Sequence, residues 1–262
     1  MRIARYTTGE DPAYGVIEGD PSVPGAAVIH ALSGDPLYVG VVPAGREPIS
    51  LDDVRLLAPV IPRSKIIGIG RNYADHAAEF GNEVPAAPMM FLIPNTAVVG
   101  PGDPVVIPRG SATLDYEGEL AVVIGKICKD VRPEHALDCV WGYTCGNDVS
   151  ERLWQRADGQ WARAKGSDTF CPLGPWVETE LDTSALRLIT RRDGEIVQDG
   201  TTADLVHGVA ALIAYAAAHF TLLPGDVILT GTPAGVGPVR PGQRVSVEIE
   251  GIGTLDNPFV RR

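Results

Sequence analysis

The chain has few of the features that mark secreted or membrane-spanning proteins. Its four cysteines in 262 residues include no C-x-x-C pair and do not indicate a disulfide framework. We therefore expect free thiols in a reducing compartment and predict a cytoplasmic protein. The first residues lack the apolar core of a signal peptide, and the longest apolar helical stretch, 209–220, is too short to span a bilayer. We expect no membrane segment.

Basic residues are also scarce. Lys and Arg total 22 against 33 Asp and Glu, which gives a formal net charge of −11. This balance argues against nucleic acid or an anionic membrane as a partner. An anionic small molecule would need a local positive centre, which a metal ion could supply. The remaining composition, 45% hydrophobic and 21% charged, is that of an ordinary globular protein with a substantial core.

Apolar patterns divide the chain into a small N-terminal part and a larger remainder. Residues 1–57 hold short apolar runs broken by Gly, Pro and Asp, including a possible hairpin of strands at 2–6 and 14–18. The proline-rich segment 58–63 then marks a boundary. We predict a small β-rich domain over 1–57 and a catalytic domain over 58–262.

Strands dominate the larger part, so we expect an α+β, mostly β fold with mixed sheets. Asp193-Gly194, between apolar runs, predicts a two-residue hairpin turn. Asn72 as N-cap and Gly81 as a terminating residue predict a short helix over 72–81. Two more helices are predicted over 134–141 and 204–220.

The most informative stretch is 114–125, in which two glutamates precede an apolar, β-branched run. Alternate residues of a strand point the same way, so Glu117 and Glu119 project together from the end of a buried strand. Two carboxylates this close repel each other unless a cation lies between them. Such oxygen ligands bind Mg²⁺, Mn²⁺ or Ca²⁺. Two glutamates on a solvated strand face would show the same spacing.

Two further residues could complete such a site. Asp148 follows the strand-like segment 143–147 and would add a third carboxylate, which suits octahedral Mg²⁺ with positions left for substrate. Lys165 lies among small residues, where it could neutralise a substrate carboxylate or a developing enolate. A lone lysine is more often a surface charge, and the sequence alone does not show that Asp148 approaches the pair.

Five sequence blocks resemble the fumarylacetoacetate hydrolase family over about residues 63–262. The blocks are Gly-Arg-Asn-Tyr-Ala-Asp-His-x-x-Glu (70–79), Tyr-Glu-Gly-Glu-Leu (116–120), Gly-Tyr-x-x-x-Asn-Asp-Val-Ser (142–150), Asp-Thr-Phe-x-Pro-x-Gly-Pro-Trp (168–176) and Pro-Gly-Asp-Val-Ile-x-Thr-Gly-Thr-Pro-x-Gly-Val-Gly (224–237). The resemblance implies a distorted, mostly β roll as the catalytic domain. It also implies a dimer, so we expect a homodimer.

The resemblance further implies the roles of individual residues. Family members bind Mg²⁺ or Mn²⁺ through a Glu-x-Glu pair and a later Asp, which correspond here to Glu117, Glu119 and Asp148. The implied catalytic residues are His76 and Glu79, on a lid within 71–88, and Lys165. The implied substrate-binding residues are Arg71, Tyr73, Arg152, Gln155, Gly231 and Thr232. One departure is Ala-Lys-Gly at 164–166, where many members have Gly-Lys-Ser; loss of that serine would alter substrate orientation.

The implied substrate is a 2-oxo or 2,4-dioxo acid. Cleavage of its C3–C4 bond leaves a pyruvate enolate that the metal stabilises, while His76, oriented by Glu79, deprotonates the attacking water. Hydrolysis of an acylpyruvate is the first expectation. Oxaloacetate decarboxylation and isomerisation of a 2-hydroxy-dienoate in aromatic catabolism pass through the same centre and stay open. A member that binds metal without turnover is a further alternative, against which the retained His76, Glu79 and Lys165 argue.

Overall fold

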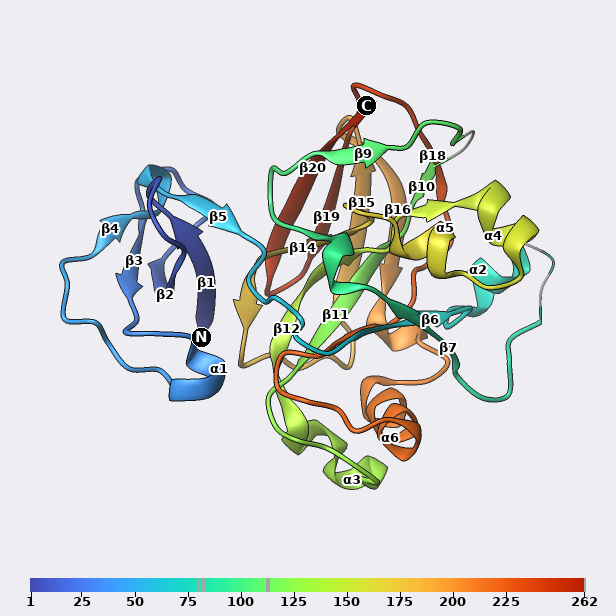
Figure 1. The fold of residues 1–262 in the computed structure, drawn as a ribbon, viewed down its shortest axis with the longest axis horizontal. Coiled ribbons are helices and arrows are strands. Elements are labelled where there is room, and N and C mark those ends of the chain that lie inside the picture. Colours follow the sequence, from blue (N-terminus) through green and yellow to red (C-terminus); the bar gives the residue numbers. More distant parts are fainter. Residues whose placement is uncertain (80, 82, 112–113, 262) are drawn as a thin grey trace.

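A computed structural model describes residues 1–79, 81, 83–111 and 114–261. The largest sheet contains β1 (Arg2–Thr7), β2 (Ala13–Gly19), β3 (Ala27–Ala31), β4 (Ile49–Ser50), β5 (Arg55–Leu57), β6 (Ile66–Gly70), β7 (Met89–Ile93), β8 (Val98–Val99), β11 (Gly118–Ile124), β12 (Val140–Asn147), β14 (Cys171–Glu178) and β17 (Val227–Leu229). Its strand order in the described chain is β4-β3-β2-β1-β14-β12-β11-β17-β6-β7, with β5 beside β1 and β8 beside β14. In Figure 1, β1 to β5 form a lobe at the left.

Two smaller sheets complete the β structure. One contains β9 (Val105–Ile107), β15 (Arg187–Arg192), β16 (Glu195–Thr201), β19 (Arg244–Ile249) and β20 (Gly253–Arg261), in the order β16-β15-β19-β20-β9. The other contains β10 (Leu114–Tyr116), β13 (Ser150–Glu151) and β18 (Gly237–Val239), with β10 in the middle. Most pairings are antiparallel, whereas β6 with β17, β8 with β14 and β9 with β20 are parallel. The prediction of a mostly β fold with mixed sheets is confirmed.

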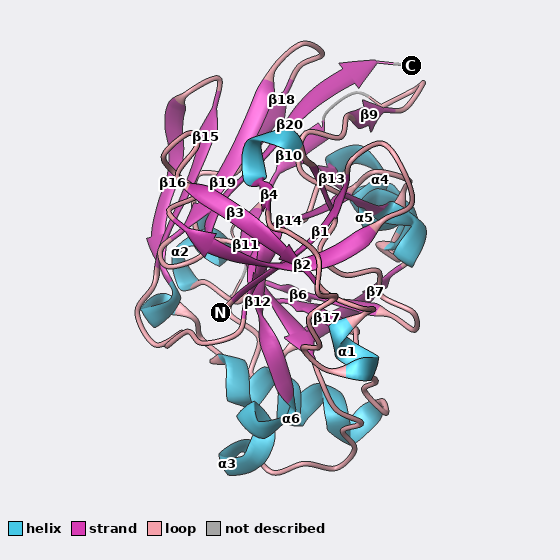
Figure 2. Cartoon of the chain, turned by 90° about the vertical axis from the view of Figure 1, so that its left-hand side faces the viewer, coloured by secondary structure: helices cyan, strands magenta, loops and turns pink. Residues whose placement is uncertain are grey.

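The helices are short apart from one. They are α1 (Pro36–Val39), α2 (Ala74–Glu79), α3 (Pro133–Ala136), α4 (Arg152–Asp158), α5 (Ala162–Gly166) and α6 (Val209–His219), with single 3₁₀ turns η1 (Leu51–Asp53), η2 (Asn95–Ala97), η3 (Leu137–Cys139) and η4 (Thr202–Asp204). Figure 2 shows α3 and α6 together at the lower end of the molecule. No helix in the described residues has the length and hydropathy needed to cross a membrane.

Two of the predicted helices were too long. The helical turns expected over 134–141 end at Cys139, because Val140 pairs with Ile124 and begins β12. The helix expected over 204–220 begins only at Val209. The chain just before it is held elsewhere: the N–H groups of Val206 and His207 donate to the backbone and side-chain oxygens of Asn72. Helices α4 and α5 were not predicted.

The main core lies on both faces of β11. Leu120, Val122 and Ile124 point into a hydrophobic cluster shared with α6 and the five-stranded sheet. Ala121 and Val123, the alternate residues, point into a second cluster with β14 and β17. A strand buried on both faces has a continuous apolar sequence, which explains the uninterrupted run of residues 120–124. This rigid strand carries Glu119 near its start.

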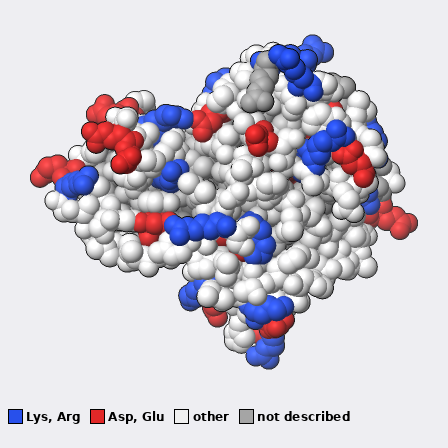
Figure 3. All heavy atoms as spheres, viewed as in Figure 1, with Lys and Arg blue, Asp and Glu red and all other residues white. Residues whose placement is uncertain are grey.

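Both predicted hairpins are present. Strands β1 and β2 pair antiparallel, as do β15 and β16. Between the second pair, Asp193 and Gly194 have φ angles of 52° and 85°, the left-handed values that a two-residue hairpin turn requires. The four cysteines are free thiols and all are buried. On the face in Figure 3, acidic and basic side chains are interspersed, with no broad patch of one sign.

Candidate metal centre and active site

A break between two strands falls at Glu117, and Glu119 is the second residue of the strand that follows. Glu117 lies between the end of β10 and the start of β11, so the pair is not part of one continuous strand as the sequence suggested. Strands β11 and β12 pair with Gly118 opposite Asn147, which brings Asp148 beside Glu117. The Asp148 N–H donates to the Glu117 carbonyl at 2.9 Å. The register of β11 and β12 therefore brings Asp148 close to Glu117, which the sequence alone did not show.

Glu117, Glu119 and Asp148 form a buried carboxylate cluster. One oxygen from each lies within 4.8 Å of the other two. Oδ1 of Asp148 is buried and has no hydrogen-bond partner among the described residues. Burial and the charges of Asp148 and Glu117 raise the pKa of Glu119 well above its usual range. Three hard oxygen donors, one of them unpaired, fit a divalent cation such as Mg²⁺ or Mn²⁺.

Two cationic side chains reach this cluster from α4 and α5. Lys165 Nζ lies 2.7 Å from Glu117 Oε2 and 2.6 Å from Asp148 Oδ2. Lys165 is 2% exposed, so the alternative of a surface lysine is wrong. Arg152 lies between Asp115, at 2.7 Å, and Glu117, at 2.6 Å. Burial alone would raise the pKa of Glu117, but Lys165 and Arg152 outweigh it and lower that pKa to about 2.

The charges of this group do not balance. Among the described residues, the four carboxylates of Asp115, Glu117, Glu119 and Asp148 form ion pairs only with Arg152 and Lys165, which leaves a formal charge of −2 for these six groups when every one is ionised. Burial raises the pKa of Asp148 to about 6. The charge of Lys165 lowers this pKa and the charge of Glu117 raises it further, so the Lys165 contact does not restore the ordinary value. A buried excess of two negative charges is what one divalent cation would neutralise.

His76 and Glu79 lie on α2, one helical turn apart. His76 Nδ1 is 3.3 Å from Glu79 Oε2. The other Glu79 oxygen accepts a hydrogen bond from the Gly235 N–H at 2.8 Å. The pair is therefore docked against the glycine-rich loop after β17. Phe80 and Asn82, which belong to the lid predicted over 71–88, lie outside the described residues.

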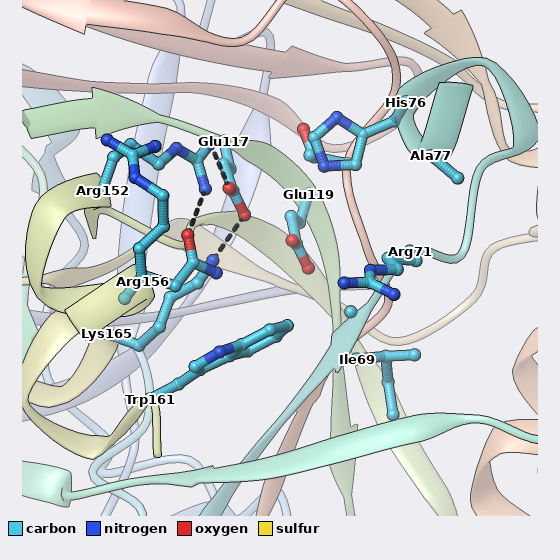
Figure 4. Close-up of a pocket in the computed structure, with 13 residues that line it drawn as sticks. Ile69, Arg71, His76, Ala77, Glu117, Glu119, Arg152, Arg156, Trp161 and Lys165 are labelled. Atoms are coloured by element: carbon cyan, nitrogen blue, oxygen red, sulfur yellow. Dashed lines mark hydrogen bonds and ion pairs between the residues drawn. The ribbon is translucent and has the colours of Figure 1, made fainter. Parts of the chain in front are cut away.

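Glu117, Glu119 and His76, with Arg152 and Lys165, line one cavity of about 370 Å³ (Figure 4), a volume within the range of small-molecule sites. It is lined by Ile69, Gly70, Arg71, His76, Ala77, Glu117, Glu119, Arg152, Gln155, Arg156, Trp161, Lys165 and Thr232. Asp148 and Glu79 are not among the described residues that line it. Arg71 has a φ of 58°, a left-handed value that costs a non-glycine residue about 1 kcal/mol or more. In Figure 4 the His76 ring lies close to Glu119, and Arg71 approaches Glu119 from another side.

Some predicted substrate residues are engaged within the protein. Arg152 also donates to Gln155 at 3.0 Å, so the two form one unit. The Gly231 N–H donates to Glu119 Oε2 at 2.7 Å. Tyr73 is buried and is not among the described residues that line the cavity. Burial and the Glu119 charge raise the pKa of its phenol.

The sequence analysis did not name as site residues five residues of the cavity wall, Ile69, Gly70, Ala77, Arg156 and Trp161, of which Arg156 and Trp161 carry a charge or an aromatic ring. Arg156 lies one helical turn after Arg152 on α4, so its place on the same face would have followed had that helix been predicted. Trp161 precedes α5, with its ring 5.2 Å from that of Phe91 in an edge-on arrangement. An aromatic wall opposite charged groups is typical of a site for a small organic anion.

Comparison with known proteins identifies the family. Residues 65–260 match the model for the fumarylacetoacetate (FAA) hydrolase C-terminal domain, and residues 1–59 match the model Rv2993c-like, N-terminal. The chain belongs to the fumarylacetoacetate hydrolase family. The resemblance seen in the five sequence blocks is thereby confirmed.

Two known proteins match the whole chain and a third matches most of it. Protein Rv2993c of Mycobacterium tuberculosis is 47% identical over 265 residues, covering 100% of this chain and 99% of that protein. A 5-carboxymethyl-2-hydroxymuconate delta-isomerase structure from Mycobacterium smegmatis is 48% identical, with a TM-score of 0.92 and full coverage of both chains. A fumarylpyruvate hydrolase from Pseudomonas aeruginosa, solved with Mn²⁺ and pyruvate, is 32% identical, with a TM-score of 0.73 over 79% of this chain and 92% of that one.

Proposed function

We propose that this protein is a divalent-metal-dependent enzyme that hydrolyses a C–C bond in a 2,4-dioxo acid of the acylpyruvate type. The observation that carries the proposal is the buried cluster of Glu117, Glu119 and Asp148, whose excess negative charge faces a cavity that also receives His76 and Lys165. The Mn²⁺ and pyruvate in the Pseudomonas aeruginosa hydrolase structure support both the cofactor class and the substrate end. The homodimer expected from the sequence stays a prediction.

The bound cation would polarise the 2-oxo group, so that electrons from the breaking C3–C4 bond move toward the 2-oxygen. The residues of the chain supply the rest. With Nδ1 turned toward Glu79, His76 uses Nε2 to take a proton from the water that attacks C4. The water oxygen bonds to C4, the C3–C4 bond breaks, and C3 takes a proton. The products are pyruvate and a carboxylic acid, and the Lys165 ammonium balances the developing charge.

The cavity favours a substrate with more than one anionic group. Arg71 and Arg156 both line it, and no ion pair within the described parts of the chain involves either one. In a chain of net charge −11, two such guanidinium groups at one cavity provide positive charge for anionic groups of a substrate. We assign both to binding a substrate carboxylate.

Isomerisation is the second candidate. The Mycobacterium smegmatis structure, 48% identical over the full chain, carries the name of an isomerase. Its reaction needs proton transfer without cleavage, and His76 with Glu79 could provide that step as well. Release of pyruvate separates the two candidates, because only cleavage of the C–C bond produces it.

The test is a substrate panel with controlled metal content. Protein treated with EDTA is returned to Mg²⁺ or Mn²⁺ and offered acetylpyruvate, fumarylpyruvate, oxaloacetate and 2-hydroxyhepta-2,4-diene-1,7-dioate. Pyruvate is followed through NADH consumption by lactate dehydrogenase, and isomerisation by the ultraviolet spectrum. We expect metal-dependent pyruvate release from a 2,4-dioxo acid. Pyruvate release that EDTA leaves unchanged, or conversion of the dienoate alone, would overturn the proposal.

A further inference from the structure

A closed ring of hydrogen bonds surrounds Gly118, the residue between the two glutamates. The Gly118 N–H donates to Gln198 Oε1 at 3.0 Å, and Gln198 Nε2 donates to Thr232 Oγ1 at 2.8 Å. Thr232 Oγ1 in turn donates to the Gly118 carbonyl at 2.8 Å. Both polar groups of this one peptide unit are thus bonded to the same pair of side chains, which come from β16 and from the loop after β17.

Gln198 uses its whole amide in this arrangement. Its second N–H donates to the Pro233 carbonyl at 2.8 Å, and the residue is 2% exposed. A rotated amide would place its NH₂ group against the Gly118 N–H, so the ring fixes the orientation of the side chain. The hydroxyl proton of Thr232 is committed to Gly118, although Thr232 lines the cavity. The Thr232 hydroxyl, expected from the sequence to bind substrate, therefore already donates its proton to a backbone carbonyl within the protein.

The ring replaces hydrogen bonds that a continuous strand would have made. At the break between β10 and β11, the Glu117 N–H donates to the Asn147 side chain at 3.0 Å and the Gly118 N–H to that of Gln198. Two buried side-chain amides thus hold two successive peptides. A side chain at position 118 would force the buried Thr190 to move, because its Cβ would lie 2.1 Å from Thr190 Oγ1.

The hydrogen-bonded ring lies between two side chains that repel each other. Glu117 and Glu119 are like charges held close together, and their repulsion would turn the two side chains apart if the backbone between them could rotate. The same loop that supplies Thr232 also supplies the Gly231 N–H, which donates to Glu119 Oε2. One loop therefore fixes both the peptide between the glutamates and the side chain of one of them.

We propose that Gln198 and Thr232 are positioning residues that hold Glu117 and Glu119 at the separation needed for a divalent cation. The inference rests on the cation binding in the proposed function and adds two residues to which the sequence gave no such role. Gln198 does not line the cavity and contacts no carboxylate in the described contacts, so it acts through Gly118 and through the loop that carries Thr232 and Pro233. Its removal should weaken metal binding first and turnover only as a consequence.

The primary test is calorimetry of Mn²⁺ binding to Gln198→Met, which keeps the side-chain size and removes all three hydrogen bonds. We expect the affinity to fall about 10- to 100-fold, the usual cost of losing support behind metal ligands. Asn257→Leu is the matched control: Asn257 is also a buried amide, and it donates to the carbonyls of Gly100 and Asp103, none of which line the cavity. That variant should lose thermal stability but keep the wild-type Mn²⁺ affinity.

Variants at Thr232 decide the case even if Gln198→Met fails to fold. Thr232→Val removes the hydroxyl and should lower Mn²⁺ affinity as much as Gln198→Met, whereas Thr232→Ser should restore it. Because both residues belong to one ring, the double variant should bind Mn²⁺ no more weakly than either single variant. If Gln198→Met or Thr232→Val binds Mn²⁺ as tightly as the wild type, the inference about positioning fails while the proposed function stands. Wild-type protein that binds no Mn²⁺ would overturn the proposed function along with it.

Discussion

Lys65 and Lys165 are both largely buried lysines that pair with buried carboxylates, but their surroundings differ. Lys65 Nζ lies 2.5 Å from Asp226 Oδ2 and also donates to Ser64 Oγ and the Thr221 carbonyl. Asp226 accepts two further bonds, from the backbone N–H groups of Lys65 and Leu223. At this site one cation pairs with one anion, and each of the two groups also forms further hydrogen bonds.

Lys165 instead faces a group with more negative than positive charge. It contacts two carboxylates while a third, that of Glu119, lies beside them, and one Asp148 oxygen has no partner in the described structure. A balanced buried pair is a structural support, whereas an unbalanced one stores repulsion that a ligand can relieve. Charge balance, more than burial, separates the two lysines and marks the candidate site.

The largest expected effect on activity comes from His76, because the described contacts of Lys65 include no comparable base. Replacing His76 by Ala removes the proposed base, so acylpyruvate hydrolysis should fall by about 10² to 10⁴. Oxaloacetate decarboxylation needs no attacking water and should fall less, whereas Lys165→Ala should lower both activities. Coupled NADH assays measure each rate. If His76→Ala lowers both activities equally, the histidine does not act by activating water.

Removing one negative charge from the unbalanced cluster should weaken cation binding next most strongly. Glu119→Gln keeps the size of the side chain but removes a proposed ligand, and we expect Mn²⁺ affinity to fall by more than about 100-fold. Titration calorimetry with Mn²⁺ and Mg²⁺ measures the change. An affinity equal to that of the wild type would remove Glu119 from the metal site.

The balanced pair should respond in the opposite way. Asp226→Asn leaves Lys65 without its counter-ion and should cost about 3 kcal/mol of unfolding free energy, at the low end for a buried pair because Lys65 keeps some solvent contact. Mn²⁺ affinity should stay unchanged. Urea unfolding and calorimetry on the same preparation test both halves, and a parallel loss of metal binding would contradict the separation of the two lysines.

The smallest expected effect is a pH dependence of the metal-free protein. The pKa of Glu119 is raised by burial and by Asp148 and Glu117, and that of Asp148 is raised by burial to about 6. Carboxyl groups with pKa values above those of the unfolded chain, about 4, bind protons more tightly when folded, so stability falls as pH rises through the raised values. The melting temperature in EDTA should therefore decrease as the pH rises from about 4 through 6, and the raised pKa of Glu119 extends the decrease to higher pH. Saturating Mn²⁺ should reduce this slope, and identical slopes would count against a shared site.

Local patterns predicted much of the fold because they reflect local physics. The apolar run at 120–124 and the turn at Asp193-Gly194 follow from periodicity or turn chemistry within a few residues. The helix that carries His76 is present, but the side chain of Asn72, its predicted N-cap, bonds to His207 and Thr230 instead. The ends of the helices were less predictable. The start of α6 at Val209 depends on Asn72, which binds the preceding segment from 135 positions away.

The carboxylate pair was recognisable from its spacing, but its surroundings were not. Asp148 reaches Glu117 through the register of β11 and β12, and Lys165 is buried only because α5 brings it to that pair. Gln198 lies in a correctly predicted strand, yet nothing in its local sequence indicates that it supports Gly118. Contacts of this kind join distant segments, so a single sequence does not contain them as a pattern.

The pairing of β1 with β14 has a consequence for truncated forms of this protein. Arg2 and Ile3 pair with Glu178 and Val177, and they cover one border of β14 while β12 covers the other. Deleting residues 1–57 would uncover the backbone groups of Val177 and Glu178 on this border. An exposed strand border can pair with another molecule. We therefore expect a chain that lacks the N-terminal lobe to self-associate more readily than the full chain.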